Sequence, residues 1–70
     1  MTAPFVRGAT AALWVFDLAG RRVAVIRGRS GSRLVWDGKD RGGRRVAPGL
    51  YLYRMEVGRH RQEGKVVVLP

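Results

Sequence analysis

Glycine interrupts this chain so regularly that only short structural elements fit between the interruptions. Ten glycines are spread through 70 residues. They separate apolar runs at intervals of roughly 8 to 12 residues, the spacing typical of sandwiches and barrels. No run repeats its apolar residues with a helical period, and glycine is a poor helix former. The spacing therefore predicts an all-β protein, a small β-sandwich or compact barrel of about five antiparallel strands.

The apolar runs also place the expected strands and the domain boundary. Residues 1–11, which contain Pro4 and Gly8, are expected to form an N-terminal arm, and residues 12–70 a single domain. Asp17 and Gly20 suit the first and last positions of a type I turn, so they should close a hairpin between the first two strands. The five expected strands are residues 12–17, 22–27, 33–36, 50–57 and 65–69, the last of which could begin as early as 60–62.

Several of these strands are apolar on both faces, which is unusual for a half-buried sheet. Alternation puts Leu13 and Val15 on one face of the first strand, and Trp14 and Phe16 on the other. A chain of 70 residues without cysteine builds only a small core. Either a strongly curved barrel buries both faces, or a second copy covers one of them; we expect homo-oligomerisation through that face and an open strand edge. The expected interface residues are Phe5, Trp14, Phe16, Leu50, Leu52 and Val67.

The charge of the chain indicates a second kind of partner. Fourteen basic residues face five acidic ones, which gives a net charge of +9. Such a surface attracts polyanions, although arginines spread along a sequence also fit an ordinary solvated surface. The alternative function is therefore a basic small β-barrel that binds single-stranded nucleic acid or another polyanion, with Trp14 and Tyr53 as stacking aromatics.

Four motifs resemble one family in order and spacing. Residues 15–23 read Val-Phe-Asp-Leu-Ala-Gly-Arg-Arg-Val, and residues 36–43 read Trp-Asp-Gly-Lys-Asp-Arg-Gly-Gly. Residues 46–54 read Val-Ala-Pro-Gly-Leu-Tyr-Leu-Tyr-Arg, and residues 65–69 end the pattern with Lys-Val-Val-Val-Leu. This combination resembles the FlgD-like immunoglobulin-type domain, which is related to the C-terminal type A sorting domain of the type IX secretion system.

The resemblance implies an Ig-like β-sandwich without catalytic residues. It implies a sorting, anchoring or assembly module of a secreted or cell-surface bacterial protein, with the secretion or surface machinery as a partner. Family members begin with a Pro-x-Pro-Phe segment and an extra strand. Here only Pro4 and Phe5 match that start, so the N-terminal strand is expected to be missing. The residues expected to fix the turns and packing are Asp17, Gly20, Trp36, Asp37, Gly38, Gly49 and Tyr51.

The sequence carries little that resembles a catalytic or metal site. His60 is the only histidine and there is no cysteine, so a zinc site is not expected. Asp37 and Asp40 lack the ligand pattern of a calcium loop; we expect Asp37 to cap a turn and Asp40 to pair with an arginine. The expectation is a non-enzyme without cofactor, metal or small-molecule substrate.

Two kinds of hydrophobic segment are also missing from the sequence. No apolar run approaches the roughly 20 residues of a membrane span, so none is expected. The first residues include Arg7 but no apolar core of a signal peptide. The expectation is that the protein either stays inside the cell as written or is a mature or excised piece of a secreted protein.

Overall fold

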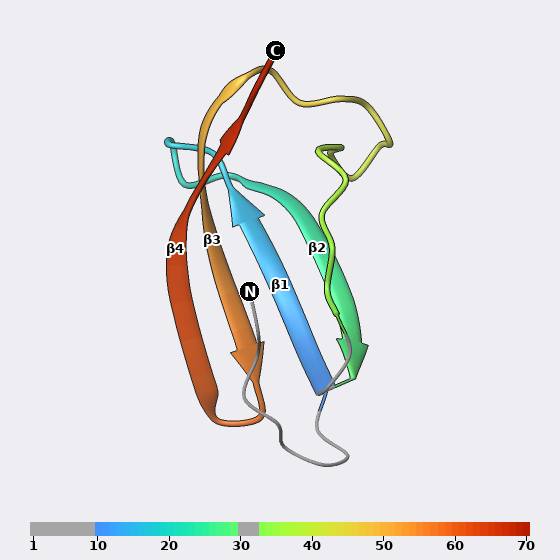
Figure 1. Cartoon of the computed structure of the whole chain (residues 1–70), viewed down its shortest axis with the longest axis vertical. Coiled ribbons are helices and arrows are strands. Elements are labelled where there is room, and N and C mark those ends of the chain that lie inside the picture. Colours follow the sequence, from blue (N-terminus) through green and yellow to red (C-terminus); the bar gives the residue numbers. More distant parts are fainter. Residues whose placement is uncertain (1–9, 30–32) are drawn as a thin grey trace.

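The described part of the chain is all-β, and its four strands form one open antiparallel sheet (Figure 1). The computed structural model describes residues 10–29 and 33–70. Along the sheet the strands lie in the order β2-β1-β3-β4. The expected arm, with Phe5, falls outside the described residues, apart from positions 10 and 11, which belong to the first strand. The strands are β1 (Thr10–Phe16), β2 (Arg22–Arg29), β3 (Gly49–Val57) and β4 (His60–Val68).

Two tight turns connect the paired strands. Asp17 and Gly20 close the β1–β2 hairpin as expected: Gly20 N–H donates to the Asp17 carbonyl at 3.0 Å, and Gly20 has a φ of 83°. Gly58, with a φ of 57°, begins the turn between β3 and β4, where Val57 pairs with His60. The final strand is therefore one continuous element that begins at His60.

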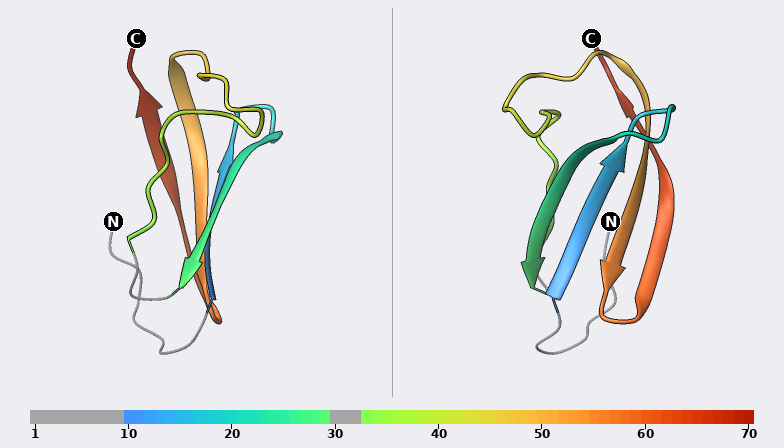
Figure 2. Two further views of the ribbon diagram at one scale, coloured as in Figure 1. Left: turned by 90° about the vertical axis from the view of Figure 1, so that its right-hand side faces the viewer. Right: turned by 180° about the vertical axis from the view of Figure 1, so that it is seen from behind.

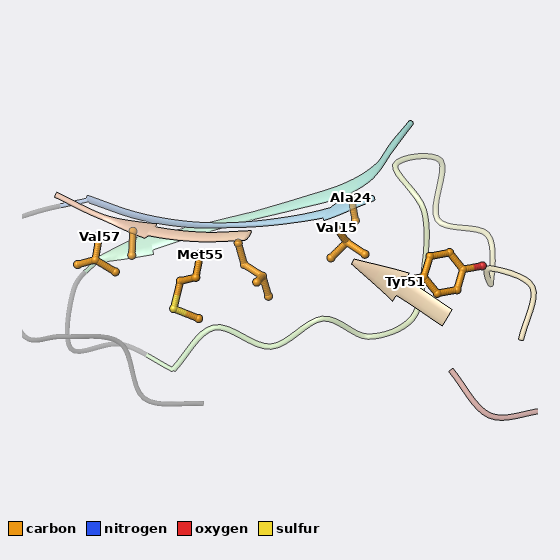
Figure 3. Packing of buried hydrophobic residues seen from close by; sticks show 7 residues of the cluster. Val15, Ala24, Tyr51, Met55 and Val57 are labelled. Carbon is orange, nitrogen blue, oxygen red and sulfur yellow. The ribbon is translucent and has the colours of Figure 1, made fainter. Parts of the chain in front are cut away.

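The core lies on one face of this sheet. Its side chains alternate along the strands, as pleating requires, and they point to the same side of the ribbon (Figure 3). Val15 and Val57 are the most deeply buried, each with 1% of its surface exposed. Full burial of one such side chain stabilises the fold by about 1.5 to 3 kcal/mol. The buried hydrophobic residues are Ala11, Leu13, Val15, Ala24, Tyr51, Met55 and Val57.

Residues 33–48, which we call the covering segment, lie over this core face (Figures 2 and 3). The expected strand at 33–36 was wrong: these residues join no strand ladder. The reason is geometric, because the backbone lies over the core face of the sheet, out of the plane in which a strand could pair with β2 (Figures 2 and 3). Leu34 and Trp36 pack against the core, whereas Val35 between them is 64% exposed.

Two hydrogen bonds and one aromatic contact hold the covering segment in place. The Trp36 indole Nε1–H donates to the Lys39 carbonyl at 2.9 Å, and the Tyr51 hydroxyl donates to the Ala47 carbonyl at 2.6 Å. The two rings meet edge to face, with centroids 5.6 Å apart. The described residues thus form a single four-stranded sheet with an irregular cover, and not five strands.

Candidate interaction face

The second face of the sheet carries its own apolar surface. We call it the outer face; it lies opposite the covering segment (Figure 2). Strand register brings its residues together across the sheet: Trp14 pairs with Val25, Phe16 with Leu52, and Leu50 with Val67. The outer-face apolar residues are Trp14, Phe16, Val25, Leu50, Leu52 and Val67.

This apolar surface remains accessible to solvent within the described part of the chain. Leu50 is 37% exposed, Leu52 38% and Val67 61%. Trp14 and Phe16 are half-buried on the same face. Five of the six expected interface residues thus lie on one face, and the sixth, Phe5, lies outside the described residues. A contiguous apolar patch that crosses several strands is typical of an interaction surface.

Arginines lie against both outer-face aromatic rings. The guanidinium carbon of Arg22 lies 5.3 Å from the centroid of the Trp14 ring, and that of Arg27 lies 5.9 Å from it. Arg54 lies 5.5 Å from the centroid of Phe16. These distances fit cation–π contacts. Alternation along the strands was a signal for them in the sequence, because it puts Arg27 in the same row as Val25 and Arg54 in the same row as Leu52. The net charge alone does not indicate these contacts.

Two polar groups on this face have no hydrogen-bond partner among the described residues. They are the Trp14 indole Nε1–H and the Arg54 Nε–H, both shielded from solvent. Arg54 Nε lies 3.6 Å from a Glu56 carboxylate oxygen, an ion pair that is too long for a hydrogen bond. A shielded donor without an acceptor costs stability.

The residues expected to shape turns occupy two of the three connections between strands, the one between β1 and β2 and the one between β2 and β3. In the first, the Asp17 Oδ1 accepts hydrogen bonds from the backbone N–H groups of Ala19 and Arg21. Its Oδ2 accepts one from the Arg21 side-chain Nε–H at 3.0 Å. The backbone bond from Arg21 is the main reason that the pKa of Asp17 lies below its ordinary value of 3.8. This carboxylate is therefore held ionised by the turn that it closes.

The second connection uses aspartates in a similar way. Asp37 Oδ1 accepts from the Lys39 backbone N–H at 3.1 Å. Asp40 Oδ1 accepts from the N–H groups of Gly42 and Arg44. Asp40 pairs with no guanidinium among the described residues, so that expectation was wrong there; its Oδ1 serves the loop backbone instead. Gly38 and Gly49 have φ values of 77° and 148°, a region that favours glycine.

Tyr53 does not join the outer face. It belongs to the row of β3 that packs towards the core, and its ring lies over Gly64 of β4. The expected pair of stacking aromatics, Trp14 and Tyr53, is thus divided between the two faces.

Residues 10–29 and 33–70 contain no group of three or more His, Cys, Asp or Glu residues placed to hold a metal ion. They also contain no helix long and apolar enough to cross a membrane. His60 is exposed at the start of β4.

The chain matches no protein-family model, no curated protein and no solved structure. The resemblance to FlgD-like domains therefore remains a prediction carried by its four sequence motifs.

Proposed function

We propose that this chain is a non-catalytic assembly module that associates with a second copy of itself through the outer face. The observation that carries the proposal is the open apolar patch, to which all four strands contribute. The core face already has its cover, whereas the outer face has none among the described residues. A second sheet packed about 10 Å away is the common way to bury such a surface.

The charge pattern of this face is compatible with pairing of identical copies. Glu56 and Glu63 stand among the basic residues of β3 and β4, where they lie near Arg54 and Arg61. In a symmetric dimer the same surface of both copies forms the interface, so the carboxylates of one copy would lie opposite the guanidiniums of the other. The apolar patch would supply the affinity, and these charges would set the orientation.

The resemblance to FlgD-like domains gives the proposal its biological setting. The family implies an Ig-like sandwich that sorts, anchors or assembles a secreted bacterial protein. A sheet with one missing strand and one open face would complete its second layer with a partner copy. On this basis we propose a role outside the cell or at its surface, in contact with secretion or surface machinery, and without enzymatic activity.

The test is the mass of the protein in solution. Light scattering after size exclusion, at two protein concentrations and in high salt, is expected to show a defined multimer. Val67→Glu places a charge on the outer face and should give a folded monomer. Val35→Glu is the matched control, because Val35 is equally exposed, at 64% against 61%, but lies on the covering segment. A folded wild-type monomer at both concentrations would overturn the proposal.

A second candidate function is binding of a polyanion on the same face. It is favoured by the guanidiniums that lie against Trp14 and Phe16. They partly occupy the aromatic faces, so phosphate or sulfate groups are better ligands here than stacked bases. Titration with a single-stranded oligonucleotide should then show affinity that falls steeply with salt and is reduced by Arg54→Ala. Salt-independent binding would refute this candidate.

A further inference from the structure

A groove of about 430 Å³ runs along the free edge of β2. One wall is β2 itself, from Arg22 to Arg27, and the other is the loop at residues 36–41. Figure 1 shows this loop beside β2, the strand at one edge of the sheet. The groove is separate from the outer-face patch, although Arg22 and Arg27 border both.

The backbone of β2 is available on the groove side. β2 pairs with β1 on one side only, and no described residue pairs with it on the other. An edge strand of eight residues presents a row of N–H and C=O groups to which an extended segment can add as a further strand. The groove is thus shaped and chemically equipped for a β-strand.

The charges around this edge select the kind of strand. The groove is lined by four basic side chains, Arg22, Arg27, Lys39 and Arg41, and by two acidic ones, Asp37 and Asp40. The two carboxylates accept hydrogen bonds from their own loop backbone. None of the four basic groups has an ion-pair partner among the described residues. The surplus of positive charge along the edge therefore favours binding of an acidic ligand.

A second copy of this chain is a poor occupant of the same edge. Pairing β2 with β2 would set the basic groups of one groove against those of the other, and the other free edge, β4, brings Arg61 and Lys65 against a single Glu63. Like charges at close range oppose association. We propose that the β2 edge groove binds an extended acidic segment of a different protein as an added strand. This hetero-partner site is distinct from the self-association surface of the outer face, which it meets at Arg22 and Arg27.

The test uses a fluorescent ten-residue peptide of alternating valine or threonine and glutamate, followed by fluorescence anisotropy. The acidic peptide is expected to bind, and a lysine version is expected not to. A second acidic peptide, N-methylated at alternate residues, keeps the charge but cannot form the ladder, and should bind at least tenfold more weakly. Chemical-shift changes in the NMR spectrum should map to the β2 amides.

Matched variants separate this groove from the rest of the basic surface. Lys39→Ala with Arg41→Ala should weaken peptide binding about tenfold, whereas Arg59→Ala with Lys65→Ala, the same loss of charge elsewhere, should leave it unchanged. Val67→Glu should also leave binding intact, so failure of self-association would not be mistaken for failure of this site. Equal binding of the N-methylated peptide, or an equal effect of both charge pairs, would show general attraction to polyanions and overturn the proposal.

Discussion

Gly64 is the position where the packing makes its sharpest prediction. It pairs across the sheet with Tyr53, whose ring occupies the space that a side chain at position 64 would need. A Cβ added to Gly64 would lie 2.5 Å from the Tyr53 hydroxyl oxygen and 2.6 Å from two carbons of its ring. Carbon atoms in contact prefer about 3.5 to 4.0 Å, so in Gly64→Ala the ring must retreat by roughly 1 Å.

The net cost follows from two opposing effects. Overpacking of this kind costs about 1 to 3 kcal/mol. Replacement of glycine by alanine recovers about 0.4 to 1 kcal/mol, because the unfolded chain becomes less flexible. We expect a net loss of about 1 to 2 kcal/mol in the free energy of unfolding. For a chain of 70 residues, whose total stability is on the order of 3 to 10 kcal/mol, that is a substantial part.

Urea unfolding at one fixed protein concentration measures this loss, and a double-mutant cycle assigns it to the ring. In a Tyr53→Ala background the space is open, so Gly64→Ala should be neutral or slightly stabilising there. The difference between the two backgrounds is the coupling between the residues. If Gly64→Ala stabilised the protein with Tyr53 present, or cost the same in both backgrounds, the packing argument would be refuted.

Two further predictions concern the connections between strands. Gly43→Ala should cost about 1 to 2 kcal/mol, because Gly43 has a φ of 81°. Gly42→Ala, in the same loop without that conformation, should cost clearly less in thermal unfolding; equal costs would contradict the assignment. The lowered pKa of Asp17 contributes stability that is complete above pH 3.8 and is lost as the pH falls through the lower folded pKa. The stability difference between wild type and Asp17→Asn should therefore shrink in acid, and a constant difference would argue against it.

The sequence predicted best those elements whose signals are local. The pair Asp17 and Gly20 specifies a turn by its own hydrogen bonds, and the apolar runs on either side have only one simple way to pair. The same period-2 reading placed Trp14 and Leu52 on the face opposite the core. Alternation fixes the face of a residue without any knowledge of the partner strand.

Elements that depend on distant contacts could not be predicted in the same way. Residues 33–36 look like a strand because Leu34, Val35 and Trp36 form a short apolar run, but a segment that lies over a sheet also turns apolar side chains to the core. Only the position of the backbone relative to the sheet separates these cases. The β2 groove could not be predicted for a similar reason. Lys39 and Arg41 lie more than ten residues after Arg22 and Arg27 in the sequence, and only the folded chain places them beside β2.

The two faces of the sheet differ in whether their polar groups have hydrogen-bond partners, and this difference bears on the proposed assembly. On the core face, the covering segment satisfies its own polar groups: Trp36 and Tyr51 each present an apolar ring to the core and donate a hydrogen bond to that segment. On the outer face, Trp14 has the same chemistry but no acceptor for its indole among the described residues. A layer over the outer face that carries carbonyl or carboxylate oxygens would make the two faces alike.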